Sequence, residues 1–220
     1  MGRWRFTAMQ MIKGITIKLH INGNIETVEN VLVGEPNTSD SAIGNCKIKT
    51  YTVAIPKGDS HDWTNKKVVF FGSKFRTVGK EIQGIESNIP LCWHKKISIE
   101  ELIINGNCTF FDSRDFTRHV YNGILLFDNR NFIRDKTGET KNGSLDIQIY
   151  GVNNTDSEWF PKVGDYIVPE ICDFEFNTSD EQKISESMAD FRKKYNNFAV
   201  VNSIEKRFSD VSPDLIISAR

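Results

Sequence analysis

The chain has 220 residues, a formal net charge of −1, 39% hydrophobic residues and 26% charged residues. With only 6 Pro and 15 Gly, this composition argues for a globular protein with a buried core and against a fibrous or disordered one. Ile and Val occur 25 and 14 times, against 8 Leu and 6 Ala. Because β-branched residues favour strands over helix interiors, we predict a mainly β protein.

Membrane and metal partners are not expected. No apolar run reaches the roughly 18 to 20 residues that cross a bilayer, and the N-terminal residues lack the continuous apolar segment of a secretory signal. The cysteines are far apart and form no CxxC pair, so we expect free thiols and no zinc site.

The small net charge conceals a difference between the two halves of the chain. Residues 1–105 carry 14 Lys and Arg against 10 Asp and Glu, whereas residues 106–220 carry 14 Lys and Arg against 19 Asp and Glu.

The first half of the chain is rich in strand patterns. Residues 15–21 alternate apolar and polar side chains, as a half-buried strand does, and Asn22-Gly23 then favours a hairpin turn. Polar loops are predicted at 37–45 and 57–62, and a tight turn at Gly72-Ser73. Further strands are predicted at 28–33, 51–55, 67–71 and 74–78, and residues 97–104 are predicted to form a closing strand or a connector. Strands joined by short turns without helices indicate a small barrel or sandwich.

The second half is also β and begins after the candidate boundary at Asn105. A long polar loop is predicted at 128–144. Strands are predicted at 108–111, 120–127, 145–150, 166–168, 174–176 and 198–201. We therefore predict an N-terminal arm at 1–14, a first β-barrel unit at 15–105 and a second at 106–220.

One amphipathic helix is predicted at 180–195, with Ser179 as its N-cap. Its apolar face recurs at i, i+4, i+7 and i+11 and consists of Ile184, Met188, Phe191 and Tyr195. Such a face is typical of core packing, and a partner-binding face is the alternative.

The two halves repeat the same order of elements. Residues 31–33 match 124–126 at an offset of 93, and residues 53–55 match 147–149 at an offset of 94. Trp63 matches Trp159 at an offset of 96. The pattern predicts a structural repeat with little sequence identity.

The densest polar cluster is the candidate site, and it consists of Lys57, Asp59, Ser60, His61 and Asp62, followed by Trp63. The consecutive residues 60–62 are not a nucleophilic triad, because neighbours in an extended chain point apart. One loop with a single His also lacks the second element of a metal site. We interpret the cluster as a turn anchored by Trp63. Since no nucleotide-binding or metalloprotease motif occurs, no enzymatic activity or cofactor is expected.

Basic residues in the first half interleave with aromatic ones, and they include Lys66, Lys67, Lys74 and Arg76. On a small barrel this pattern suits nucleic-acid phosphates and bases. Solvated lysines over an aromatic core are the alternative.

The string YTVAIPKGDSHDW at 51–63 is followed by VVFFG at 68–72, KFRT at 74–77 and NIPL at 88–91. Together these motifs resemble the minor capsid proteins of tailed phages of Gram-positive bacteria, over roughly residues 15–101. The second half, with DIQIY at 146–150 and KVGDYIV at 162–168, resembles more distantly a phage neck protein of the stopper type. Members similar to the first half usually stand alone at about half this length.

The resemblance implies a virion protein of the head–tail junction, synthesised in the host cytoplasm. Such a protein forms a homo-oligomeric ring, here of six or twelve chains, beneath the portal and adaptor proteins. It closes the channel on the packaged double-stranded DNA and docks the tail terminator or tail tube. The 57–62 loop is then a candidate channel or ring contact. A tail terminator or other tail-junction component, and an OB-like nucleic-acid-binding barrel, remain alternatives.

Overall fold

The computed structural model describes residues 12–21, 23–44, 46–88, 91–135, 138–153, 159–207 and 213–220. Most of the predicted N-terminal arm lies outside these ranges. Contacts divide the chain into unit 1, Met1–Asn37 with Lys49–Glu101, and unit 2, Thr38–Ile48 with Leu102–Arg220. The division therefore falls after Glu101, whereas the sequence placed the boundary near Asn105. Helix α1 (Glu181–Lys194), the one α-helix in the described part of the chain, has neither the length nor the apolar composition to span a bilayer.

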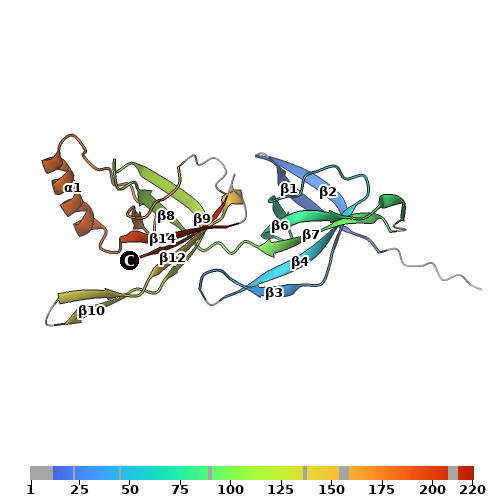
Figure 1. Cartoon of the computed structure of the whole chain (residues 1–220), viewed down its shortest axis with the longest axis horizontal. Coiled ribbons are helices and arrows are strands. Elements are labelled where there is room, and N and C mark those ends of the chain that lie inside the picture. Colours follow the sequence, from blue (N-terminus) through green and yellow to red (C-terminus); the bar gives the residue numbers. More distant parts are fainter. Residues whose placement is uncertain are drawn as a thin grey trace, which may run out of the picture. The chain divides into compact units, whose positions relative to one another are not determined.

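The first β-barrel is an antiparallel sheet that closes on itself (Figure 1). Its strands are β1 (Ile15–Ile21), β2 (Asn24–Val33), β3 (Asn37–Asp40), β4 (Lys47–Pro56), β5 (Lys67–Phe70), β6 (Ser73–Gln83) and β7 (Trp93–Glu101). The strand order is β2-β1-β5-β6-β7-β4-β3, and β2 also pairs with β4. This last pairing closes a six-stranded barrel, with β3 as an additional strand. A short 3-10 helix, η1 (Glu86–Asn88), lies between β6 and β7.

The second β-barrel is closed as well. Its strands run in the order β12-β15-β14-β13-β8-β9, and β10 and β11 form a separate two-stranded hairpin that projects from the barrel (Figure 1). The strands are β8 (Gly106–Phe111), β9 (Arg118–Asp128), β10 (Asn131–Asp135), β11 (Gly138–Asn142), β12 (Leu145–Ile149), β13 (Tyr166–Val168), β14 (Ala199–Arg207) and β15 (Asp214–Ala219). A 3-10 helix, η2 (Gly151–Asn153), follows β12.

Both barrels have the same topology. Replacing β1, β2, β4, β5, β6 and β7 by β8, β9, β12, β13, β14 and β15 reproduces every strand pairing of the first barrel. The register agrees too, because Leu32 pairs with Ala54 in unit 1 and Leu125 pairs with Gln148 in unit 2. These two pairs are related by the offsets of 93 and 94 found in the sequence. The predicted internal repeat is confirmed.

Alternating side chains fill the barrel interiors. In unit 1, Ile17 and Leu19 of β1 are 1% and 0% exposed and pack with Trp63 and residues of the neighbouring strands. In unit 2, Phe110 and Ile147 lie in the corresponding core and are fully buried. Inward and outward positions alternate along each strand, so the inward side chains together fill the interior of a small barrel. The prediction of two small barrels in tandem is thus confirmed.

Helix α1 covers part of unit 2. Its N-cap is Asp180, whose carboxylate accepts the backbone N–H of Lys183 at 2.8 Å, so the predicted N-cap, Ser179, is wrong by one residue. Both residue types cap helices, and here Asp180 has the extended backbone that the position requires. On the predicted apolar face, Phe191 and Tyr195 are buried in a cluster against which Met188 packs, whereas Ile184 is half-exposed. Three of the four residues of the face therefore pack on the core of unit 2.

Several predicted boundaries are corrected by the structure. The predicted loop at 37–45 contains β3, and the predicted loop at 128–144 contains the β10–β11 hairpin. These strands were not predicted because their sequences are polar and lack the alternation of apolar residues that marks a strand packed on a core. Residues 174–176 form no strand, and the rings of Phe174 and Phe176 instead pack on Phe191. Strand β15 was not predicted. The β5–β6 turn is Phe71-Gly72, one residue earlier than expected, and both residues have positive φ angles of 48° and 76°.

Candidate functional site

The candidate site is the loop of residues 57–66 between β4 and β5. Pro56 ends β4, and Gly58 allows a tight turn because its φ is +81°. The N–H of Asp59 donates to the carbonyl of Pro56 at 3.3 Å, and the N–H of Lys57 donates to the carbonyl of Cys92 at 2.8 Å. Further along, the Asp62 carboxylate accepts the N–H of Thr64 at 2.9 Å, which lowers the pKa of Asp62. The loop is therefore an ordered turn, in agreement with the sequence interpretation.

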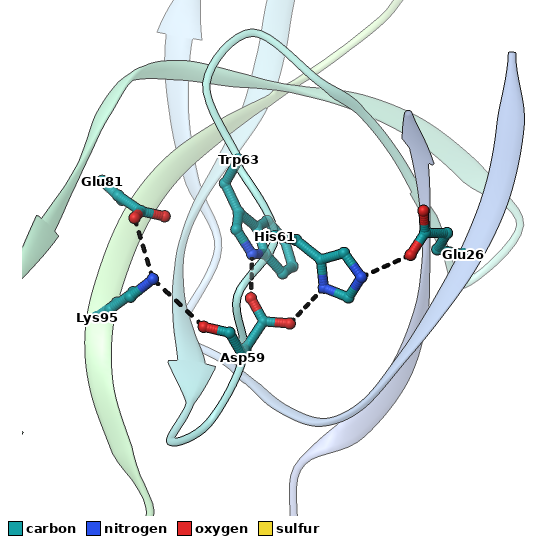
Figure 2. A network of polar contacts seen from close by, with 6 residues as sticks. All are labelled: Glu26, Asp59, His61, Trp63, Glu81 and Lys95. Carbon is teal, nitrogen blue, oxygen red and sulfur yellow. Dashed lines mark hydrogen bonds and ion pairs between the residues drawn. The ribbon is translucent and has the colours of Figure 1, made fainter. Parts of the chain in front are cut away.

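Asp59 is the centre of a polar network (Figure 2). Its carboxylate is 4% exposed. One carboxylate oxygen lies 2.5 Å from Nδ1 of His61, and the other accepts the indole N–H of Trp63 at 2.7 Å. Trp63 is fully buried in the barrel core. A carboxylate removed from water needs such donors, so Asp59 ties the polar loop to the apolar interior.

His61 links the loop to β2. Its Nε2 lies 2.6 Å from a carboxylate oxygen of Glu26, while Nδ1 faces Asp59 (Figure 2). Only the doubly protonated ring donates from both nitrogens, so two carboxylates favour the imidazolium form. The pKa of His61 is accordingly raised, with the hydrogen bond to Asp59 as the main cause.

A second connection runs from the loop to β6 and β7. The ammonium group of Lys95 donates to the backbone carbonyl of Asp59 at 3.3 Å and to the carboxylate of Glu81 at 3.1 Å (Figure 2). The Lys95 side chain is 11% exposed, so this ion pair is shielded from solvent. The loop is thus bound directly by charged side chains of β2 and β7, and Glu81 of β6 binds the lysine that contacts it.

This arrangement stabilises the loop and is not suited to proton transfer. Neither nitrogen of His61 is available to accept a proton from a nucleophile, because each already faces a carboxylate. Ser60 is exposed and adjacent in sequence to His61, which is not the geometry of a catalytic pair. Within the described residues, no group of three or more His, Cys, Asp or Glu side chains forms a potential metal site.

The four basic residues singled out in the sequence do not act as one group. Arg76 is 3% exposed, and its guanidinium binds the Glu100 carboxylate through Nε at 2.5 Å. Lys66 lies 3.8 Å from Asp62. Lys67 and Lys74, by contrast, have no carboxylate partner among the described residues, and burial together with the charge of Lys74 lowers the pKa of Lys67.

Unit 2 contains a related tryptophan with different surroundings. The indole N–H of Trp159 donates to the Asp112 carboxylate at 3.3 Å, and the ring of His119 stacks on the indole with centroids 3.9 Å apart. Hydrogen bonds from Arg114 are the main cause of a lowered pKa at Asp112. The tryptophan–carboxylate contact therefore recurs in both barrels, although Asp59 lies four residues before its tryptophan and Asp112 follows β8.

Sequence reasoning missed Glu26, Glu81 and Lys95 as members of the network. Glu26 and Lys95 lie 35 and 36 residues from the loop residues that they bind. Lys95 lies within the range of roughly 15–101 over which the resemblance was noted, but outside the motifs that carry it. No sequence pattern marked either glutamate.

Comparisons with known proteins add no assignment. No protein-family model matches the chain, and neither the curated proteins nor the solved structures include a significant match.

Proposed function

We propose that this protein is a structural component of a phage neck, a ring-forming head-completion or stopper protein that closes the portal channel and connects head to tail. One observation carries the proposal. The resemblance to minor capsid proteins covers roughly residues 15–101, and in the structure β1 begins at Ile15 and β7 ends at Glu101. The resemblance therefore covers one complete closed barrel, as expected when a whole folding unit is shared.

The repeated topology supports a role in a ring. Two barrels with the same strand order supply two similar modules per chain. A ring of six chains then presents twelve similar modules, which suits a twelvefold portal of the kind that the resemblance implies. The closed sheets and filled cores make each module a rigid support.

Projecting segments on this support are suited to contacts with neighbours. The β10–β11 hairpin pairs with no other strand that the structure describes, so its backbone edges suit pairing with another chain. The 57–66 loop, in contrast, is cross-linked through Asp59, His61 and Lys95. We therefore assign movement or insertion to the hairpin and a fixed contact surface to the loop.

The direct test is to locate the protein in phage particles. The C-terminal residue Arg220 is exposed, and its backbone pairs with Val200, so a tag should follow a flexible linker of about ten residues. Gold-labelled particles imaged by electron microscopy should carry the label at the head–tail junction. Label confined to the capsid shell or tail tip would refute the proposal. A copy number of twelve chains, measured by native mass spectrometry of isolated necks, would refute the six-chain ring alone.

A tail terminator is the second candidate, because it uses the same logic of β-rich rings. Co-purification separates the two: a neck protein should remain with the portal after tails are detached, whereas a terminator should remain with the tail tube. The OB-like alternative is less well supported by the fold. OB domains are five-stranded and partly open, whereas both barrels here have six strands and are closed.

A further inference from the structure

The outer surface of β1, β5 and β6 carries a row of basic side chains from distant parts of the sequence. Strand pairing aligns Lys18 with Val69 and Val69 with Lys74. It also aligns His20 with Lys67, two residues further along the strands. The residues between them, Leu19 and its neighbours Val68 and Phe75, are buried in the barrel core. Because side chains alternate across a strand, the basic residues point outward together. We call Lys18, His20, Lys67 and Lys74 the basic face.

Within the described part of the chain, the charges of the basic face are not neutralised by ion pairs. No described carboxylate forms an ion pair with Lys18, Lys67 or Lys74. The pKa of His20 is lowered by burial and by these three lysines, with no acidic group acting in the opposite direction. Other basic residues of unit 1 do have carboxylate partners, because Arg76 pairs with Glu100 and Lys49 pairs with Glu101. The positive charges therefore repel one another, and a bound anion would relieve this repulsion.

We propose that the basic face binds the phosphodiester backbone of DNA. The face spans two inter-strand spacings, about 10 Å, across the sheet, and about 7 Å between alternate residues of one strand. A strand of B-DNA presents one phosphate per about 3.4 Å of helix axis, so the three lysines meet about three phosphates. The lysines lie on strands of a closed barrel, so the spacing of their backbone positions is fixed before binding. No loop has to become ordered when DNA binds, which avoids an entropic cost.

An acidic protein partner fits this surface less well. Protein interfaces rely on a desolvated centre of aromatic and apolar side chains. At the centre of the basic face lies only Val69, which is half-buried. The strongly exposed apolar side chains nearby, Ile25 and Phe71, belong to the flanking strand β2 and to the β5–β6 turn. Binding through charge alone is characteristic of backbone contacts with nucleic acid.

The inference rests on the proposed function in one respect, because a neck protein meets packaged double-stranded DNA. The binding test uses purified protein and does not depend on the location in the particle. A chain that binds DNA through this face but is absent from the neck would refute the proposed function alone. A chain that lies in the neck but does not bind DNA would refute this inference alone.

The experiment compares two triple variants of the full chain that carry the same net charge. One replaces the basic-face lysines, as Lys18→Gln, Lys67→Gln and Lys74→Gln. The matched control replaces three exposed lysines elsewhere in unit 1, as Lys13→Gln, Lys80→Gln and Lys96→Gln. Binding of a fluorescent 30-base-pair duplex is followed by anisotropy between 50 and 200 mM NaCl, and thermal unfolding verifies that all three proteins fold.

For three phosphate contacts, wild-type affinity should fall about 40-fold over this fourfold range of salt concentration. The control should behave as the wild type does. The basic-face variant should lose most of its affinity at 50 mM NaCl and change less than about twofold with salt. Absence of wild-type binding at 50 mM, or equal losses in both variants, would overturn the inference.

Two further measurements test other occupants. If poly-L-glutamate displaces the duplex at equal concentrations of charge, the face does not prefer phosphate, and an acidic protein becomes the partner. If the basic-face variant changes the oligomeric state in sedimentation velocity but retains wild-type DNA affinity, the face joins copies of this chain. Either result would refute DNA binding as its role, and neither is expected.

Discussion

Replacing His61 by Gln should destabilise unit 1, because the substitution removes the cation between Asp59 and Glu26. The Asp59 carboxylate is 4% exposed, and a hydrogen bond to a charged group of this kind contributes about 2 kcal/mol. The Glu26 side chain is 45% exposed, so its ion pair contributes about 0.5 kcal/mol. The total, about 2.5 kcal/mol, corresponds to about 70-fold faster amide exchange through opening of the barrel.

Hydrogen exchange measured by mass spectrometry suits this prediction, because it reports on each unit separately. Peptides of β4 and β5 should exchange faster in the His61→Gln variant, and peptides of unit 2 should not change. Ser60→Ala provides the control on the same loop, since its exposed side chain should contribute less than about 0.5 kcal/mol. Glu26→Gln should show only the smaller share of the effect.

The effect should also depend on pH. The pKa of His61 is raised in the folded protein, so its contribution is complete below the ordinary value of 6.5 and is lost as the pH rises through the folded value. The difference between wild type and His61→Gln should therefore be larger at pH 6 than at pH 9. An equal difference at both pH values, or a cost below about 0.5 kcal/mol at pH 6, would refute the role of His61 as a charged cross-link.

Three further predictions test the fold, and two of them include a control substitution. Asp180→Ala should cost about 1 kcal/mol and fray α1 by circular dichroism, whereas Ser179→Ala should have little effect; the reverse ranking would contradict the N-cap assignment. Phe191→Ala should cost about 3 to 5 kcal/mol in thermal unfolding of unit 2, and a loss below 1 kcal/mol would mean that the helix is not core. Arg76→Gln, which leaves Glu100 unpaired in a shielded position, should lower the unfolding temperature more than Lys74→Gln; equal shifts would contradict the buried ion pair.

Local patterns predicted much of the fold because they report burial directly. Alternation over residues 15–21 identified β1, and the spacing of Met188, Phe191 and Tyr195 identified the buried face of α1. The offsets of 93 and 94 residues identified the repeat. Where burial does not decide, the patterns were insufficient. The β10–β11 hairpin lies outside the barrel, and Phe174 packs on a helix although its sequence suits a strand.

Only the loop residues of the candidate site could be predicted from the sequence. Asp59, His61 and Trp63 stand close together in the chain and were recognised as a polar cluster around an anchor. Their role depends on Glu26 and Lys95, which approach the loop through strand pairing over 35 and 36 residues. The interpretation as a turn was sound, but the charged cross-link required the distant partners.

Composition and periodicity thus determined the β class, the tandem arrangement, helix α1 and the residues of the loop. The tertiary structure alone decided how each barrel closes, which cations are neutralised and which are left as the basic face. The pairing of Lys18 with Val69 and the burial of Arg76 beside Glu100 illustrate the difference. The physical reason is that periodicity reflects the environment of one strand, whereas charge neighbours depend on which distant strands lie side by side.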